Sequence, residues 1–194
     1  EMTKEGPHTA ASFAQASPAR RAELLNVPNV VMAGAGIPND DREAERLTQE
    51  VAKSPRLVWE ISADGAGGGQ PFEGHPFVYK RRMEQVRRLV DRYPQIEGVL
   101  LDDMSNHGLD RGFKPEHIRE IRDLLPGKYR AVSLWGVVYT MSFERPNLSN
   151  YIKELDGIQL WTWHARDIGD MEKNVARCER QFPGKPIVLG LYLY

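Results

Sequence analysis

The sequence predicts an α/β fold, a parallel (β/α) TIM barrel that is incomplete in this chain. Apolar, β-rich runs alternate with amphipathic helical patterns along all 194 residues, which is typical of βαβ units and a parallel sheet. Most of these runs are continuously apolar, as in strands that are buried on both faces. The loops are short before the strands and long after several of them, as in barrels that build their active site at the strand ends.

Six runs rich in Val, Ile, Leu, Trp and Tyr are the predicted strands, because such residues favour buried strands. They are Asn29–Ala35, Leu57–Ser62, Ile96–Met104, Tyr129–Thr140, Gly157–His164 and Pro186–Tyr194. Between them, apolar side chains recur at i, i+3 and i+7 and form one stripe along each predicted helix. These helices are Asp40–Lys53, Tyr79–Tyr93, Pro115–Leu125 and Asp167–Phe182, after an earlier one that Ser17 caps and that begins at Pro18.

An open doubly wound sheet is the alternative α/β fold. It usually carries a glycine-rich phosphate-binding loop after its first strand. The nearest candidate, Ala33–Pro38, lacks the third glycine and ends in a proline. We therefore interpret this segment as a tight exit from the strand.

The number of predicted strands falls short of a closed barrel. Eight strands in about 250 residues are typical, and the last run, Ile187–Tyr194, is too apolar for an uncovered sheet edge. We expect residues 1–194 to form a single (β/α)-barrel domain, a fragment with roughly strands two to seven of a (β/α)8 barrel. Missing chain segments or self-association would then complete it.

The composition argues against several classes of partner. Hydrophobic residues make up 41% of the chain, charged residues 27%, and the formal net charge is −1. Because the charge is balanced, nucleic acid is not expected as a partner. A membrane is not expected either, because no apolar run approaches the ~20 residues of a membrane span. The lone Cys178 excludes an intrachain disulfide. This fits a reducing compartment and equally a periplasmic or secreted protein, so the localisation stays open.

Three carboxylates in or at the end of predicted strands are the candidate catalytic residues. Asp102 and Asp103 close the run Ile96–Met104, so their side chains should point to opposite sides, one of them towards the barrel mouth. Glu60 lies inside the buried run Leu57–Ser62, where a carboxylate needs a partner or a function. Desolvation would raise a carboxyl pKa and favour a general acid. The alternatives are capping roles for the aspartates and a salt bridge to an arginine for Glu60.

Aromatic and histidine side chains near the strand ends are the candidate substrate-binding residues, because flat rings with polar edges suit the C–H faces of sugars. Two pairs share faces of one strand: Trp161 with Trp163, and Thr162 with His164. Packing against helices is the alternative for any single ring, and a plain hydrogen-bonding role for His164. The full set is Trp135 and Tyr139 at the end of one strand, Trp161, Trp163 and His164 at the end of the next, Tyr192 in the last, and His107 in a loop.

A divalent ion is an alternative occupant of the same region. Oxygen and imidazole ligands suit such metals, and Asp102, Asp103, Asn106 and His107 supply both. Their spacing matches no strong metal motif, however. We therefore expect no metal or other cofactor.

Three segments resemble carbohydrate-active TIM barrels of bacterial origin: Val99–Met104, Leu160–Trp163 and Gly190–Tyr194. The resemblance implies a site at the strand ends and a carbohydrate substrate. In the similar strand of chitinase-like glycosidases, a proton-donating glutamate stands where this chain has Met104. The resemblance therefore implies that the acid of a hydrolase would be Asp103, Asp102 or Glu60.

The predicted function is that of a glycoside hydrolase acting on a poly- or oligosaccharide. One carboxylate would act as acid and another as nucleophile or base, with Trp161, Trp163 and Tyr192 lining the subsites. Two alternatives remain: a metal-dependent sugar isomerase, epimerase or aldolase on the same scaffold, and a non-catalytic glycan-binding barrel.

Overall fold

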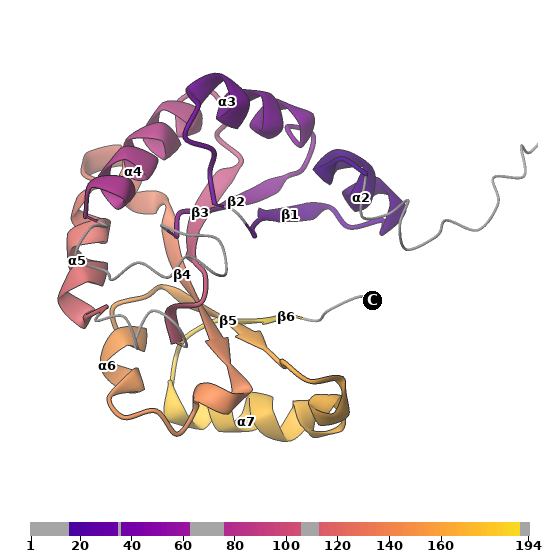
Figure 1. Ribbon diagram of the computed structural model, residues 1–194, viewed down its shortest axis with the longest axis vertical. Helices are drawn as coiled ribbons and strands as arrows, with labels where there is room; N and C mark the ends of the chain where they lie inside the picture. The colour runs from indigo at the N-terminus through magenta and orange to yellow at the C-terminus, as the bar shows by residue number, and fades with distance from the viewer. Residues whose placement is uncertain (1–15, 35, 63–75, 106–112, 191–194) are drawn as a thin grey trace, which may run out of the picture.

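The computed structural model describes residues 16–34, 36–62, 76–105 and 113–190. Six parallel strands form one sheet, in which each strand pairs with the next one in the sequence. The sheet curls into a half-barrel with the helices on its outer side (Figure 1). The predicted incomplete (β/α) barrel with six strands is therefore confirmed.

The strands are shorter than the predicted runs. They are β1 (Asn29–Met32), β2 (Arg56–Glu60), β3 (Ile96–Leu101), β4 (Ser133–Tyr139), β5 (Gly157–Trp161) and β6 (Ile187–Gly190). β3 ends at Leu101 because Asp103 adopts a left-handed backbone with φ 51°. The expectation that both aspartates close the strand on opposite sides is therefore wrong.

β4 differs most from its predicted run. Residues Gly127–Ala131 form a 3₁₀ helix, so the strand begins at Ser133. Trp135 is consequently the third residue of β4 rather than a residue at its end, and only Tyr139 ends the strand. The interpretation of Trp135 as a strand-end residue was wrong, because β4 continues past it to Tyr139.

Helices follow the strands as the apolar stripes predict. They are α2 (Pro18–Leu24), α3 (Asp41–Glu50), α4 (Pro76–Val90), α5 (Pro115–Asp123), α6 (Leu148–Ile152) and α7 (Met171–Gln181), with short 3₁₀ helices at Gly127–Ala131, Thr140–Ser142 and Ala165–Asp170. Ser17 caps α2 as predicted, and its Oγ accepts the Arg20 N–H at 3.3 Å. The sequence did not reveal α6, which is too short to display a periodic stripe.

Two layers of side chains cover the two faces of the sheet. Outward residues such as Trp59, Leu101 and Leu134 pack with the helices in the main core. A smaller inner cluster joins Leu100, Val137 and Tyr139, against which Val58, Trp135 and Trp161 pack. This alternation is what a pleated strand requires when both faces are covered.

No helix in the described part of the chain combines the length and the apolar character needed to cross a lipid bilayer.

Candidate active site

The carboxyl ends of β2 to β5 meet at one edge of the sheet, because these strands are parallel and in register. Glu60 ends β2, and Asp102 and Asp103 follow β3 directly. Tyr139 ends β4 and Trp161 ends β5. Five of the predicted site residues therefore gather at the same edge.

Glu60 is fully buried, with 0% of its surface exposed. Its Oε2 accepts the backbone N–H of Gly34 at 2.5 Å and that of Gly36 at 3.1 Å, both in the loop after β1. Its Oε1 is also buried and has no hydrogen-bond partner among the described residues. The carboxyl is thus held on one oxygen only.

The two glycines can bind Glu60 because of their backbone. Gly34 has φ 110° and Gly36 has φ 69°, conformations that side chains disfavour. At Gly36 a Cβ would also overlap the guanidinium of Arg82, a buried residue of α4. The segment that we interpreted as a tight strand exit is therefore also a carboxyl-binding loop.

The environment of Glu60 raises its pKa. Burial is the largest cause, and the Gly34 and Gly36 N–H groups and the Arg82 charge act in the opposite direction. The charge of Asp102 raises the pKa further. The expected arginine neighbour is therefore present, but burial outweighs it.

Asp102 lies beside Glu60 and is half-buried. Its backbone N–H donates to Ser62 Oγ at 2.6 Å, which ties the ends of β3 and β2 together. Burial and, after it, the charge of Asp103 raise the pKa of Asp102. Asp102 Oδ1 accepts the Asp103 N–H at 2.8 Å, which lowers the pKa by less. The predicted effect of desolvation on this carboxyl is therefore present.

Asp103 turns towards β4. The hydroxyl of Tyr139 donates to Asp103 Oδ1 at 2.7 Å. The backbone N–H of Tyr139 in turn donates to Oγ of the buried Ser105 at 3.1 Å. Both ends of Tyr139 are thereby fixed by the loop that follows β3, so the Asp103 carboxyl has a defined orientation.

Trp163 extends the site towards β5. Its ring meets that of Tyr139 edge to face, with 5.1 Å between the centroids and 79° between the planes. Nevertheless, 42% of Trp163 is exposed. An exposed indole that is braced by a buried tyrosine offers a flat apolar surface beside the carboxylates.

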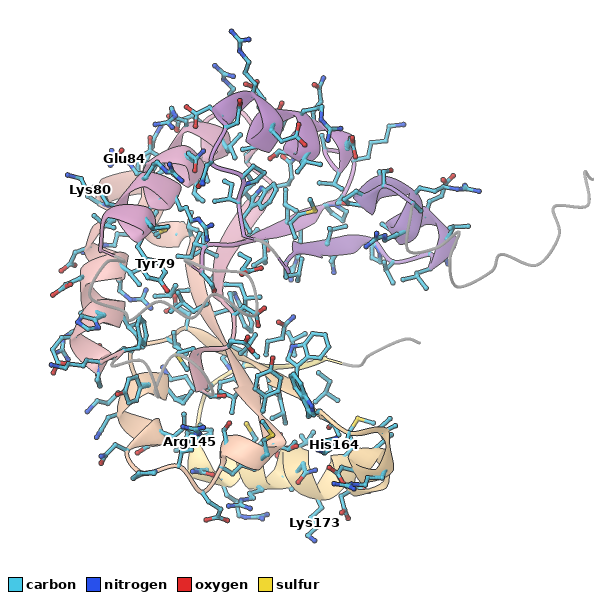
Figure 2. The ribbon with its side chains drawn as sticks, in the orientation of Figure 1. Tyr79, Lys80, Glu84, Arg145, His164 and Lys173 are labelled. Atoms are coloured by element: carbon cyan, nitrogen blue, oxygen red, sulfur yellow. The ribbon has the colours of Figure 1, made fainter. Side chains whose placement is uncertain are left out.

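The neighbours of Trp163 do not follow the predicted alternation. β5 ends at Trp161, so strand geometry does not govern the three residues after it. Thr162 is buried, whereas His164 is exposed and begins the 3₁₀ helix before α7 (Figure 2). Trp161 itself lies across Gly190 of β6, where a Cβ would overlap its indole.

Trp135 lies deeper inside the half-barrel. Its indole covers Gly98 of β3 and Gly157 of β5: an added Cβ would collide with the ring at Gly157 and make a tight contact with it at Gly98. It also lines an inner cavity of about 250 Å³ together with Val58 and Val188. Trp135 is therefore part of the floor below the carboxylates, not of their rim.

Some predicted residues lie outside the described residues, namely Tyr192, His107 and Asn106. Within the described residues, no group of three or more His, Cys, Asp or Glu side chains is arranged to hold a metal ion. Because two of the four proposed ligands are not described, the metal hypothesis stays a prediction.

Sequence reasoning missed four contributors to the site: Gly34, Gly36, Arg82 and Ser62. Two signals could have found three of them. The first is the paired glycines at the exit of a strand. The second is the position of Arg82 on the apolar stripe of α4 beside Met83 and Val86, where a charged side chain needs a polar neighbour.

Comparison with known proteins shows a shared fold with solved structures but no match to a protein family or to a curated protein. No family model and no curated protein matches the sequence. Among solved structures, the spore cortex-lytic enzyme SleL of Bacillus cereus aligns over 94% of this chain and 47% of its own, with a TM-score of 0.65 and 14% identity. A chitinase from Chromobacterium violaceum aligns over 95% of this chain and 66% of its own, with a TM-score of 0.59 and 15% identity.

The similarity is one of fold. At 14% and 15% identity, these structures show that the chain shares a barrel architecture with two carbohydrate-lytic enzymes. The chain spans about half the length of SleL and about two thirds of the chitinase.

Proposed function

We propose that this protein is a glycoside hydrolase, or a close relative of one, that acts on a poly- or oligosaccharide through Asp102 and Asp103. One observation carries the proposal: two adjacent carboxyls at the strand ends lie in different environments. Burial raises the pKa of Asp102, whereas Asp103 accepts a hydrogen bond from Tyr139. Carboxyl pairs with divergent surroundings are the usual acid and base of glycosidases.

Asp102 is the proposed general acid. A carboxyl whose pKa is raised by burial and by a neighbouring anion keeps its proton closer to neutral pH and can protonate a leaving-group oxygen. Asp103 is the proposed nucleophile or base, because the Tyr139 hydroxyl orients its Oδ1. The structural neighbours, a cortex-lytic enzyme and a chitinase, support the proposed class of reaction.

Met104 supports the choice of the aspartates as catalytic acids. It is 2% exposed and belongs to the helix-facing core. Its terminal methyl would lie 3.3 Å from a Cβ at Gly136 of β4, so the space beside β4 is filled. A proton donor at position 104 would have to displace this core packing, which leaves the half-buried Asp102 and Asp103 as the carboxyls at the end of β3.

The aromatic residues are proposed to bind the sugar rings. Trp163 offers the exposed face, and Tyr139 and Trp161 continue the apolar surface towards β6. Tyr192, His107 and His164 are proposed to complete the subsites, and Trp135 to form the floor. A carbohydrate is thus the proposed partner of this edge of the sheet.

The test is hydrolysis of a panel of glycans by the wild type, Asp102→Asn and Asp103→Asn. Removal of an acid or base typically costs about 10²–10⁴-fold, so each variant should lose that much kcat/KM. Asp123→Asn is the matched control, because Asp123 is exposed at the end of α5 and pairs with Arg130. The proposal fails if the wild type cleaves no glycan, or if both site variants keep full activity.

A non-catalytic glycan-binding barrel is the second candidate, and the exposed Trp163 favours it. Titration calorimetry of wild type and Trp163→Ala with the same glycans distinguishes it from the hydrolase. Binding that depends on Trp163 without any product in mass spectrometry would identify a binding protein. Elemental analysis of the same samples tests the metal-dependent isomerase, epimerase or aldolase, which requires a stoichiometric divalent ion that Asp102→Ala loses.

We also propose that the half-barrel is completed by further βα units. The edge strands β1 and β6 expose apolar side chains, with Val31 at 41%, Val188 at 47% and Leu189 at 45%. Both structural neighbours extend beyond the aligned region. Size-exclusion chromatography with light scattering tests the competing idea, self-association of this chain, which predicts a dimer or larger assembly.

A further inference from the structure

Glu60 has an unusual combination of contacts for a residue in a catalytic edge. It cannot reach a substrate directly, because it is 0% exposed. One oxygen receives two backbone N–H groups, and the other, Oε1, has no partner among the described residues. Burying an ionised carboxylate with an unpaired oxygen is far more costly than burying the neutral acid.

The charges around Glu60 favour the same protonation state. Asp102 approaches from β3, with Asp103 next to it, and the guanidinium of Arg82 approaches from α4. The loop after β1 contributes only backbone N–H groups at Gly34 and Gly36. Like charges that are shielded from water disfavour one another's ionisation, and among these neighbours in the described part of the chain the guanidinium of Arg82 is the one cation. We therefore infer that the three carboxyls are not all ionised together. The carboxyl without access to water is the one that best retains a proton.

We propose that Glu60 is a positioning residue that stays protonated at neutral pH and, as a neutral acid, holds the Gly34–Gly36 loop behind Asp102 without adding a second anion to the site. The catalytic part of this inference rests on the proposed hydrolase function. The protonation state does not, and it can be measured on the protein without any substrate.

The loop makes this role geometrically specific. Glu60 fixes it from inside through the two glycine N–H groups, and the Glu60 carbonyl accepts the Ile37 N–H at 2.8 Å. Gln85 of α4 fixes the same loop from outside, since its Nε2 donates to the Pro38 carbonyl at 2.9 Å. A neutral glutamate or a glutamine can make the inner contacts equally well, because an uncharged oxygen suffices as acceptor.

Carbon-13 NMR of protein labelled at the glutamate carboxyl carbon tests the protonation directly. The Glu60 resonance is identified by its loss in Glu60→Gln. Glu97→Gln provides the matched control, because Glu97 is exposed on the neighbouring strand and pairs with Arg56. We expect the Glu60 signal to remain that of a neutral acid at pH 7, and Asp102→Asn to move its titration to lower pH.

Two results would overturn the inference. One is a Glu60 signal that is already that of a carboxylate at pH 7, which would make Glu60 an anion in the folded protein. The other is a titration of Glu60 that Asp102→Asn leaves unchanged, which would remove the coupling between the two groups. Because neither result depends on glycan cleavage, failure of the proposed function would leave this measurement interpretable.

Stability against pH gives a second, independent test. The pKa of Glu60 is raised in the folded protein, so its contribution to stability is fully present below the unfolded pKa of about 4.3. That contribution is lost as the pH rises through the folded pKa. We expect the unfolding free energy of the wild type to decline over this window more than that of Glu60→Gln. Equal declines in the two proteins would contradict the inference.

Catalysis separates positioning from a merely structural role. If the hydrolase activity exists, Glu60→Gln should keep kcat/KM within tenfold of the wild type, which is about 1.4 kcal/mol. Its activity should also extend to higher pH, since the amide cannot ionise. Glu60→Ala, which cannot hold the loop, should lose more. A Glu60→Gln variant as impaired as Glu60→Ala, with an unchanged pH profile, would reject the positioning role.

Discussion

The ends of the central strands and the two edge strands use the same building unit with opposite results. At the ends of β2 to β4, polar groups pair across neighbouring strands: Ser62 joins Asp102, and Tyr139 joins Asp103. At β1 and β6, apolar residues such as Val31 and Val188 are more than 40% exposed. The comparison teaches that adjacent βα units join their strand ends through polar contacts to form the carboxyl site, whereas the two edge strands leave apolar side chains exposed.

The largest expected effect is a loss of unfolding free energy when a buried side chain of the central strand β3 is truncated, compared with an exposed one of the edge strand β6. Leu101→Ala removes a side chain that is 1% exposed on β3, and such substitutions cost about 2–5 kcal/mol. Leu189→Ala on β6, where the leucine is 45% exposed, should stay within about 0.5 kcal/mol. Urea unfolding measures both. Equal losses would show that the edge is buried in solution.

The next effect concerns the indole that bridges the central strands. Gly157→Ala would push a methyl group into Trp135, and overpacking of this kind costs about 1–3 kcal/mol. Gly169→Ala is the control, since nothing lies within 4 Å of its added Cβ. Thermal unfolding with the tryptophan fluorescence as signal compares them. If Gly157→Ala leaves the stability unchanged, the Trp135 side chain can adopt another conformation that avoids the added methyl group.

A smaller effect is expected from one hydroxyl group. Tyr139→Phe keeps the ring against Trp163 and removes the hydrogen bond to Asp103, which should cost about 1 kcal/mol. Under the proposed mechanism it should also lower kcat more than it changes KM, because Asp103 loses its orientation. Steady-state kinetics and urea unfolding are the measurements. Unchanged values in both would remove Tyr139 from the site.

The smallest expected change in the free energy of unfolding comes from placing a charge on the edge strand β6. Val188→Lys changes a side chain that is 47% exposed, so the unfolding free energy should shift by no more than about 0.5 kcal/mol. Lysine on an open edge opposes pairing with another chain. Light scattering should therefore detect less self-association than in the wild type at the same concentration. More association would assign the contact to another surface.

The fold was largely predictable from the sequence, because periodicity and continuous apolar runs record which faces are buried. The ends of strands were not. The predicted runs extend past Leu101 to Met104 and begin at Tyr129, before Ser133, whereas the left-handed backbone at Asp103 and Gly127 ends or delays the strands there. Composition carries no direct record of a left-handed φ at an aspartate, so Asp102 and Asp103 could not be oriented in advance.

The site was predictable as a set of residues and not as a set of contacts. Strand ends indicated Asp102 and Tyr139, because parallel strands bring their carboxyl ends together, and Glu60 stood out as a carboxylate inside a buried run. The partners of Glu60 come from a loop and a helix elsewhere in the chain, at Gly34 and Arg82. Such contacts depend on how the units pack, which a local pattern does not encode. Whether these residues catalyse glycan hydrolysis stays a prediction.

The left-handed backbone at Asp103, with φ 51°, restricts which side chains can replace it. Asparagine and glycine tolerate this region, and β-branched residues do not. A variant that swaps the carboxylate for an amide therefore changes chemistry alone, while one with valine would report backbone strain as well. The same constraint gives an evolutionary expectation: relatives without a carboxylate at this position should carry Asn or Gly here, so that the turn keeps a recognisable trace of the left-handed backbone.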